Sequence, residues 1–158
     1  MNTSVLRTRP PECYLIVLKD YLVALDLAES ISDFDAEAEI VARHSAACAI
    51  AALEGIERVA VAFVETGPDQ FAASVFSGMI SDRGGRVVLM GDEAESSGQA
   101  RGYSVLQRPF SQGLVRAHLA NRQQTDATRW DRRAVRVAGQ WDGSLDYSPP
   151  AATVPKLE

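Results

Sequence analysis

Short apolar runs alternate with longer amphipathic segments along the first three quarters of the chain. The run YLIVL, residues 14–18, is apolar at every position, which is typical of a strand covered on both faces. Four more short runs follow it, separated by segments of different spacing. We therefore predict five strands, at residues 14–18, 39–44, 59–64, 86–90 and 104–107.

The intervals between and after these strands have helical spacing. We predict helices at residues 21–32, 46–55, 66–85, 92–103 and 111–122. Ser45 has the position of an N-cap for the second helix, and Gly55 is placed to end it. The fourth helix is the weakest prediction, because its segment contains residues of low helix propensity, namely Ser96, Ser97, Gly98 and Gly102.

Apolar spacing also predicts which helix positions are buried. The apolar faces of the first helix come from Leu22, Val23, Leu27 and Ile31. In the third helix Pro68 suits the first turn, Gly84–Gly85 ends the helix, and three apolar residues recur every four positions: Phe71, Val75 and Met79. One side of the last helix holds Leu114, Val115, His118 and Leu119.

Five strands that alternate with five helical segments predict an α/β fold. The linkers are short, so each strand has to return through a helix to lie parallel to another strand. Such crossovers are right-handed and place helices on both faces of the sheet. The length of the chain fits one such domain.

Residues 123–158 do not continue this pattern. They mix Arg, Gly, Pro and Ser with three aromatic residues, Trp130, Trp141 and Tyr147. We expect a C-terminal tail that is disordered or loosely docked. Its aromatic and arginine residues are of the kind found in binding segments, and they fit a solvated extension equally well.

The charge is unevenly distributed along the chain. Residues 1–121 carry 10 Lys and Arg against 16 Asp and Glu, whereas residues 122–158 carry 6 against 5. An acidic body disfavours nonspecific binding to nucleic acid, and the tail has too few arginines to reverse this. We therefore expect no nucleic-acid partner.

The sequence indicates neither a membrane span nor a secretory signal. No stretch approaches the roughly 18–20 apolar residues that cross a bilayer, and MNTSVLRTRPPE lacks the apolar segment of a signal peptide. The two cysteines, Cys13 and Cys48, lie in or beside apolar runs, which favours buried, reduced thiols. We expect a cytoplasmic protein with no membrane partner.

Three stretches resemble the receiver domain of two-component response regulators. LIVLKDYLVALDLAESI is similar to the family's first strand, acidic loop and first helix, VVLMGD to its fourth strand, and VLQRPF to its fifth strand with a basic-Pro-Phe ending. The resemblance covers residues 13–122, which leaves residues 1–12 as an N-terminal extension. It implies a flavodoxin-like doubly wound (βα)5 three-layer sandwich, with a five-stranded parallel sheet of order 2-1-3-4-5.

In this family an aspartate at the end of the third strand accepts a phosphoryl group, and two acids after the first strand hold Mg²⁺. The resemblance places the acceptor position on Phe63 or Val64, neither of which can be phosphorylated. The acid positions fall on Leu18 and Lys19, or on Lys19 and Asp20. At most one of the two carboxylates is therefore kept.

The family's remaining pocket residues differ as well. Met90 stands at the hydroxyl position after the fourth strand, and Arg108, followed by Pro109, stands at the lysine position. Lys19 and Arg108 oppose Asp20 and Glu65, so the expected pocket charge is roughly 0 or +1, and Mg²⁺ should bind poorly. We predict a degenerate phosphorylation pocket with no catalytic residue, metal or cofactor.

The resemblance implies a bacterial pseudo-receiver that is not an enzyme. It would act as a protein-interaction module in a two-component phosphorelay, with a histidine kinase, another regulator or a second copy of the chain as partner. Two alternatives stay open: a phosphorylatable regulator with a displaced acceptor, Asp69 or Glu65, and a small-anion sensor that uses Arg108. His44 and His118 are isolated in the sequence, and we expect them at the surface or at strand ends.

Overall fold

The computed structural model describes residues 12–121, so residues 1–11 and the tail predicted at residues 123–158 lie outside the described part. The strands are β1 (Cys13–Val17), β2 (Glu39–Arg43), β3 (Val59–Glu65), β4 (Arg86–Met90) and β5 (Ser104–Val105). The helices are α1 (Tyr21–Phe34), α2 (Ala46–Leu53), α3 (Pro68–Ala72), α4 (Val75–Asp82), α5 (Asp92–Ser97), the 3-10 turn η1 (Gln99–Arg101) and α6 (Gln112–Ala120).

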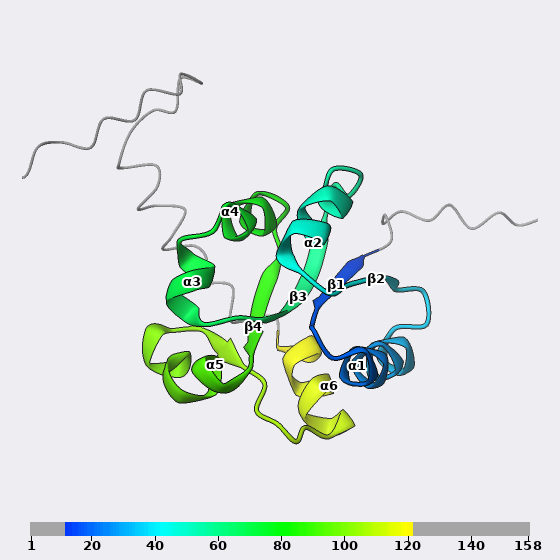
Figure 1. The fold of residues 1–158 in the computed structure, drawn as a ribbon. Coiled ribbons are helices and arrows are strands. Elements are labelled where there is room, and N and C mark those ends of the chain that lie inside the picture. Colours follow the sequence, from blue (N-terminus) through cyan, green and yellow to red (C-terminus); the bar gives the residue numbers. More distant parts are fainter. Residues whose placement is uncertain (1–11, 122–158) are drawn as a thin grey trace, which may run out of the picture.

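The five strands form one parallel sheet in the order β2-β1-β3-β4-β5. Figure 1 shows α1 and α6 on one face of this sheet, and α2, α3 and α4 on the other. Helices on both faces of a parallel sheet whose order reverses at β1 make a doubly wound three-layer fold. The predicted fold class and strand order are confirmed.

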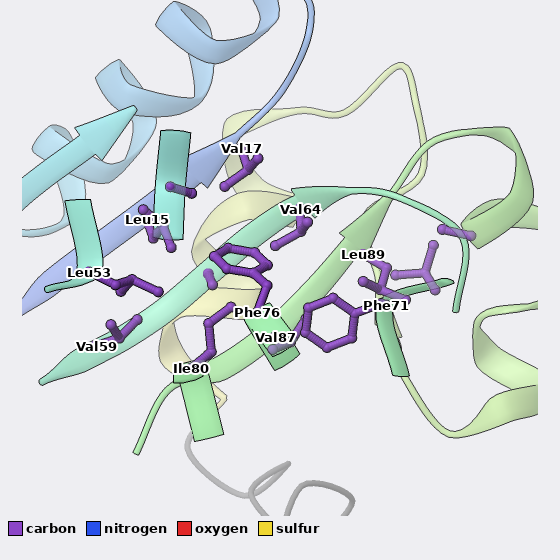
Figure 2. Close-up of a cluster of buried hydrophobic side chains, with 14 residues drawn as sticks. Leu15, Val17, Leu53, Val59, Val64, Phe71, Phe76, Ile80, Val87 and Leu89 are labelled. Atoms are coloured by element: carbon purple, nitrogen blue, oxygen red, sulfur yellow. The ribbon is translucent and has the colours of Figure 1, made fainter. Parts of the chain in front are cut away.

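The sheet separates two hydrophobic clusters. Along β1, Leu15 faces the cluster beneath α2, α3 and α4, whereas Ile16 faces the cluster beneath α1 and α6, because successive strand residues point to opposite faces. Figure 2 shows the first cluster, in which Phe71 packs edge-to-face against Phe76 with ring centroids 6.3 Å apart. Burial on both faces accounts for the unbroken apolar run at residues 14–18.

The predicted single helix at residues 66–85 is wrong, because the chain forms α3 and α4 there. Ser74 lies between them, where its hydroxyl donates to the Phe71 carbonyl at 2.7 Å and accepts from a backbone N–H of α4 at 3.2 Å. A serine cap of this kind starts a new helix. The break leaves Val75 exposed and buries Phe76 in its place, so the four-residue spacing gave the wrong buried face.

The longest helix, α1, has apolar residues on two sides. The side that faces the sheet buries Ala24, Leu27 and Ile31. The opposite side exposes Tyr21, Leu22 and Leu25, which we call the α1 apolar face, at 74%, 69% and 48%. The predicted burial of Leu22 is therefore wrong. No helix in residues 12–121 has the length and apolar character that a membrane crossing requires.

The weak fourth helical segment becomes a short helix, α5, followed by η1. The hydroxyls of Ser96 and Ser97 donate to carbonyls four residues earlier, at 2.7 and 2.9 Å. Gly98 ends α5, and a side chain there would overlap Val105 and the Ala94 carbonyl. Serine and glycine thus keep this segment to a few turns, packed closely against β5.

The cysteines and histidines lie in four different environments. Cys13 is buried, which raises the pKa of its thiol to about 11, whereas Cys48 is only half-buried, so the prediction of two buried thiols is wrong for Cys48. His44 is exposed directly after β2, as expected. His118 is half-buried on α6, and burial, with Arg86 nearby, lowers its pKa.

Candidate functional site

The candidate site is the edge of the sheet where the parallel strands end, since doubly wound folds bind ligands there. A cavity of about 240 Å³ opens at this carboxyl edge, beside the ends of β3 and β4. It is lined by Lys19, Glu65, Thr66, Gly67, Gln70, Met90, Gly91, Asp92 and Glu93. Three of the predicted pocket residues, Lys19, Glu65 and Met90, are brought together here.

The end of β3 provides no phosphoryl acceptor. Phe63 is fully buried in the cluster beneath α1 and α6, and Val64 is buried in the cluster beneath α2, α3 and α4. In the sheet register Val64 lies between Val17 of β1 and Leu89 of β4, all of them apolar. The two candidate acceptor positions are therefore core positions, and neither lines the cavity.

Glu65 is the last residue of β3 and the first polar side chain of that strand. It is half-buried, and its carboxylate accepts a hydrogen bond from the backbone N–H of Lys19 at 2.9 Å. The contact ties the loop after β1 to the end of β3. Gly91 lies beside Glu65, since a Cβ atom at this glycine would be 3.4 Å from the Cγ atom of Glu65, an ordinary contact distance.

The three predicted positions after β1 have separate roles. Leu18 is buried in the cluster beneath α1 and α6, and Lys19 is exposed and lines the cavity. Asp20 is the N-cap of α1, since its side chain accepts from the N–H groups of Leu22 and Val23 at 2.9 and 3.3 Å. The one acid kept in this loop therefore starts a helix instead of lining the cavity.

The end of β4 turns sharply into α5. Met90 is buried, and Gly91 has φ of 102°, a conformation that favours glycine. The turn brings Asp92 and Glu93 to the mouth of the cavity. The carboxylate of Glu93 lies over Gly67, where a side chain would come within 2.0 Å of its Oε2 atom.

Arg108 lies after β5 and points to α5. Its guanidinium donates to Asp92 Oδ1 at 2.6 Å and to Glu95 Oε1 at 2.9 Å, and its backbone N–H also donates to Glu95 at 3.2 Å. The hydrogen bond and charge of Arg108 lower the pKa of Glu95, and the two carboxylates raise that of Arg108. The bond from Arg108 to Pro109 is cis, and Pro109 is exposed.

The charge of the site differs from the sequence-based expectation. Around the cavity and its rim, the cations Lys19 and Arg108 are outnumbered by four carboxylates, so the expected neutral or weakly positive pocket is wrong; these are Glu65, Asp92, Glu93 and Glu95. The acidic residues of α5 were missed because they were read as part of a weak helix; their place directly after β4 is the signal that could have found them. In residues 12–121 no three His, Cys, Asp or Glu side chains are grouped to hold a metal ion.

Asp69, one of the two alternative acceptors, lies away from the other predicted residues. It is on α3 beside a second cavity of about 420 Å³, which Asp92 and Glu93 also line. Its carboxylate pairs with Arg101 at 3.1 Å, and its side chain is 73% exposed. Of the two alternatives, only Glu65 therefore lies at the end of β3.

No model of a known protein family matches the sequence, and no curated protein matches it. Solved structures do. Chemotaxis protein CheY4 of Vibrio cholerae matches with a TM-score of 0.52 and 17% identity, over 70% of this chain and 97% of that one. A response regulator receiver protein from Sinorhizobium medicae WSM419 matches with a TM-score of 0.54 and 17% identity, over 75% and 97%.

The chain has a receiver-like fold. A third structure, described as adenylate cyclase from Rhodopirellula baltica, matches with a TM-score of 0.57 and 15% identity, over 80% of this chain and 98% of that one. Identities this low establish a shared fold and carry no activity from one protein to another.

Proposed function

We propose that this receiver-like domain is a non-phosphorylatable protein-interaction module in two-component signalling. The observation that carries the proposal is the burial of Phe63 and Val64 at the end of β3, where both are core residues. Phosphoryl transfer to a protein needs an acceptor oxygen in line with the donor and cations that neutralise the developing charge. Neither acceptor position offers such an oxygen.

The remaining charged groups of the site support the same function. Arg108, which stands where the family has its phosphate-binding lysine, is already paired with Asp92 and Glu95. Glu65 accepts a hydrogen bond from the Lys19 backbone and so holds a loop. An arginine that is paired with two carboxylates is poorly suited to bind an anion, which disfavours the small-anion sensor.

The α1 apolar face supplies a surface for a protein partner. Tyr21, Leu22 and Leu25 lie next to the carboxyl edge, at the start of α1, and all three are exposed. Clustered apolar and aromatic side chains on a surface are typical of protein interfaces. A histidine kinase or another regulator is the kind of partner that the proposal assigns to this face.

Intact mass after incubation with a small phosphodonor and Mg²⁺ tests the loss of phosphorylation. We expect no phosphoryl mass gain on the full chain, under conditions in which an ordinary receiver is modified. A gain that Asp69→Ala or Glu65→Gln abolishes would establish a displaced acceptor and overturn the proposal. A gain kept in both variants would also overturn it and place the acceptor elsewhere.

Recovery of partners from the native host tests the interaction face. The change Leu22→Glu with Leu25→Glu should abolish recovery of a two-component protein by the full chain, because a buried unpaired carboxylate is costly at an interface. Val75→Glu is the control, since Val75 is at least as exposed as the two leucines but lies on α4. If the wild type, the double variant and the control recover the same amount of partner, the α1 apolar face is not the binding surface.

A further inference from the structure

His44 and Cys48 bring two metal-ligating atoms together beside the end of β2, the outer strand of the sheet, and neither residue lines the cavity at the ends of β3 and β4. His44 directly follows β2, and Cys48 lies in the first turn of α2. The Cys48 N–H donates to the hydroxyl of Ser45, the N-cap of α2, which fixes the backbone between the two side chains. The Cys48 Sγ atom lies 3.7 Å from the His44 Nε2 atom.

This separation is that of two ligands on one tetrahedral zinc ion. Zinc bonded to sulfur at about 2.3 Å and to nitrogen at about 2.0–2.1 Å places the two ligand atoms about 3.6 Å apart. The same distance also fits a weak contact between the thiol and the imidazole. Zinc would replace this contact by binding the thiolate of Cys48, and the thiol proton would pass to water. His44 is exposed and Cys48 half-buried, so solvent can deliver the ion.

One copy of the chain cannot complete such a site with sulfur and nitrogen ligands. The sequence has two cysteines and two histidines in all. Cys13 is buried at the opposite end of β1, and His118 is half-buried on α6, which covers the other face of the sheet from α2. Within residues 12–121 no acidic side chain joins His44 and Cys48 as a third ligand.

A second copy supplies the two missing ligands. Twofold symmetry repeats the same patch on both partners, so a pair of ligands becomes the Cys2His2 set of a closed zinc site. His44 and Cys48 lie beside the outer strand of the sheet, where a second copy can approach. In the described residues β2 pairs only with β1 (Figure 1). The exposed residues beside this patch on α2, Ala46 and Ala47, are small and leave room for close approach.

We propose that His44 and Cys48 bind a zinc ion that two copies of the chain share. Light scattering coupled to size exclusion should show the full chain shifting from monomer to dimer when Zn²⁺ is added, with one zinc for two chains. Co²⁺ used as a probe should give the intense visible absorption of a tetrahedral thiolate site. Cys48→Ser and His44→Gln should each weaken zinc binding by more than about tenfold and remove the shift.

Cys13→Ala, which removes the other thiol, and His118→Gln should keep both the affinity and the dimer. Far-ultraviolet circular dichroism checks that each variant is folded. One zinc for each chain without dimerisation would overturn the proposal, as would a zinc-dependent dimer that persists in Cys48→Ser. No binding at micromolar Zn²⁺ would overturn it as well.

Discussion

The two edges of the sheet use arginine in opposite ways. At the amino edge, where the parallel strands begin, Arg83 donates to main-chain carbonyls of α2, α4 and the loop before β3, at 2.9, 3.0 and 2.7 Å. Arg86 likewise donates to the carbonyls of His118 and Leu119 in the last turn of α6. At the carboxyl edge, Arg108 pairs with carboxylates at the surface, and its side chain is 39% exposed.

The difference separates the contacts that hold the fold together from the contacts that shape the candidate site. The carbonyls that end a helix have no partners within it and carry partial negative charge, so an arginine there stabilises the packing of three or four elements at once. Exposed ion pairs contribute little to stability. Changes among the charged side chains of the carboxyl edge should therefore leave the sheet and both clusters intact.

The largest effect that tests this separation is expected at Phe63, which the resemblance placed in the site and the structure places in the core. Phe63→Ala should lower the free energy of unfolding by about 3–5 kcal/mol, through lost burial and the cavity that remains. Urea unfolding of the full chain measures it. Glu65→Gln, two residues later in the same strand, is the control and should change stability far less. Similar small losses in both variants would show that the burial of Phe63 contributes little to stability.

A smaller but still large effect is expected at Arg83. Arg83→Met keeps the aliphatic stem and removes the three charged hydrogen bonds, so we expect a loss of about 2–3 kcal/mol in the free energy of unfolding. Arg101→Met is the matched control, because Arg101 is exposed and pairs only with Asp69 among the described residues. Equal losses in the free energy of unfolding for the two variants would show that Arg83 contributes no more to stability than an exposed ion pair does.

Sequence patterns predicted the sheet better than its helices. A buried parallel strand is apolar on both faces, and this shows directly in runs such as residues 14–18. Helix faces depend on where each helix begins, and the cap at Ser74 moved the buried position from Val75 to Phe76. Leu22 was misassigned for a related reason, because apolar spacing does not distinguish a core stripe from an exposed one.

The candidate site could be predicted only in part. Lys19, Glu65 and Met90 were expected at strand ends, and the order of a doubly wound sheet brings strand ends together. The acids of α5 were missed because their segment was read only as a weak helix, although they come directly after β4. Their contacts with Arg108, which follow the turn at Gly91, could not be predicted from periodicity. The pairing of His44 with Cys48 is likewise a product of the cap at Ser45.

The amino edge should also respond to pH through His118. Burial and nearby Arg86 lower its pKa in the folded state, so the unfolded chain binds this proton more readily. The stability that neutral His118 contributes is fully present above the unfolded pKa of roughly 6.5 and is lost as the pH falls below it. Urea unfolding from about pH 8 to pH 5 should show a steeper loss for the wild type than for His118→Gln. Equal slopes of unfolding free energy against pH in the two proteins would mean that the protonation of His118 is not coupled to folding.

The smallest effect on stability is expected at Arg108. Arg108→Gln removes an exposed ion pair and should shift the thermal midpoint by no more than about 3 °C. The clearer change lies in Glu95, whose pKa Arg108 lowers chiefly through their side-chain hydrogen bond, so that pKa should rise in the variant. Carboxyl resonances followed by NMR through the acid range measure it, and Arg101→Gln should leave Glu95 unchanged. The opposite result would be an unchanged pKa of Glu95 together with a large loss of stability in Arg108→Gln. It would show that Arg108 supports packing, as the arginines of the amino edge do.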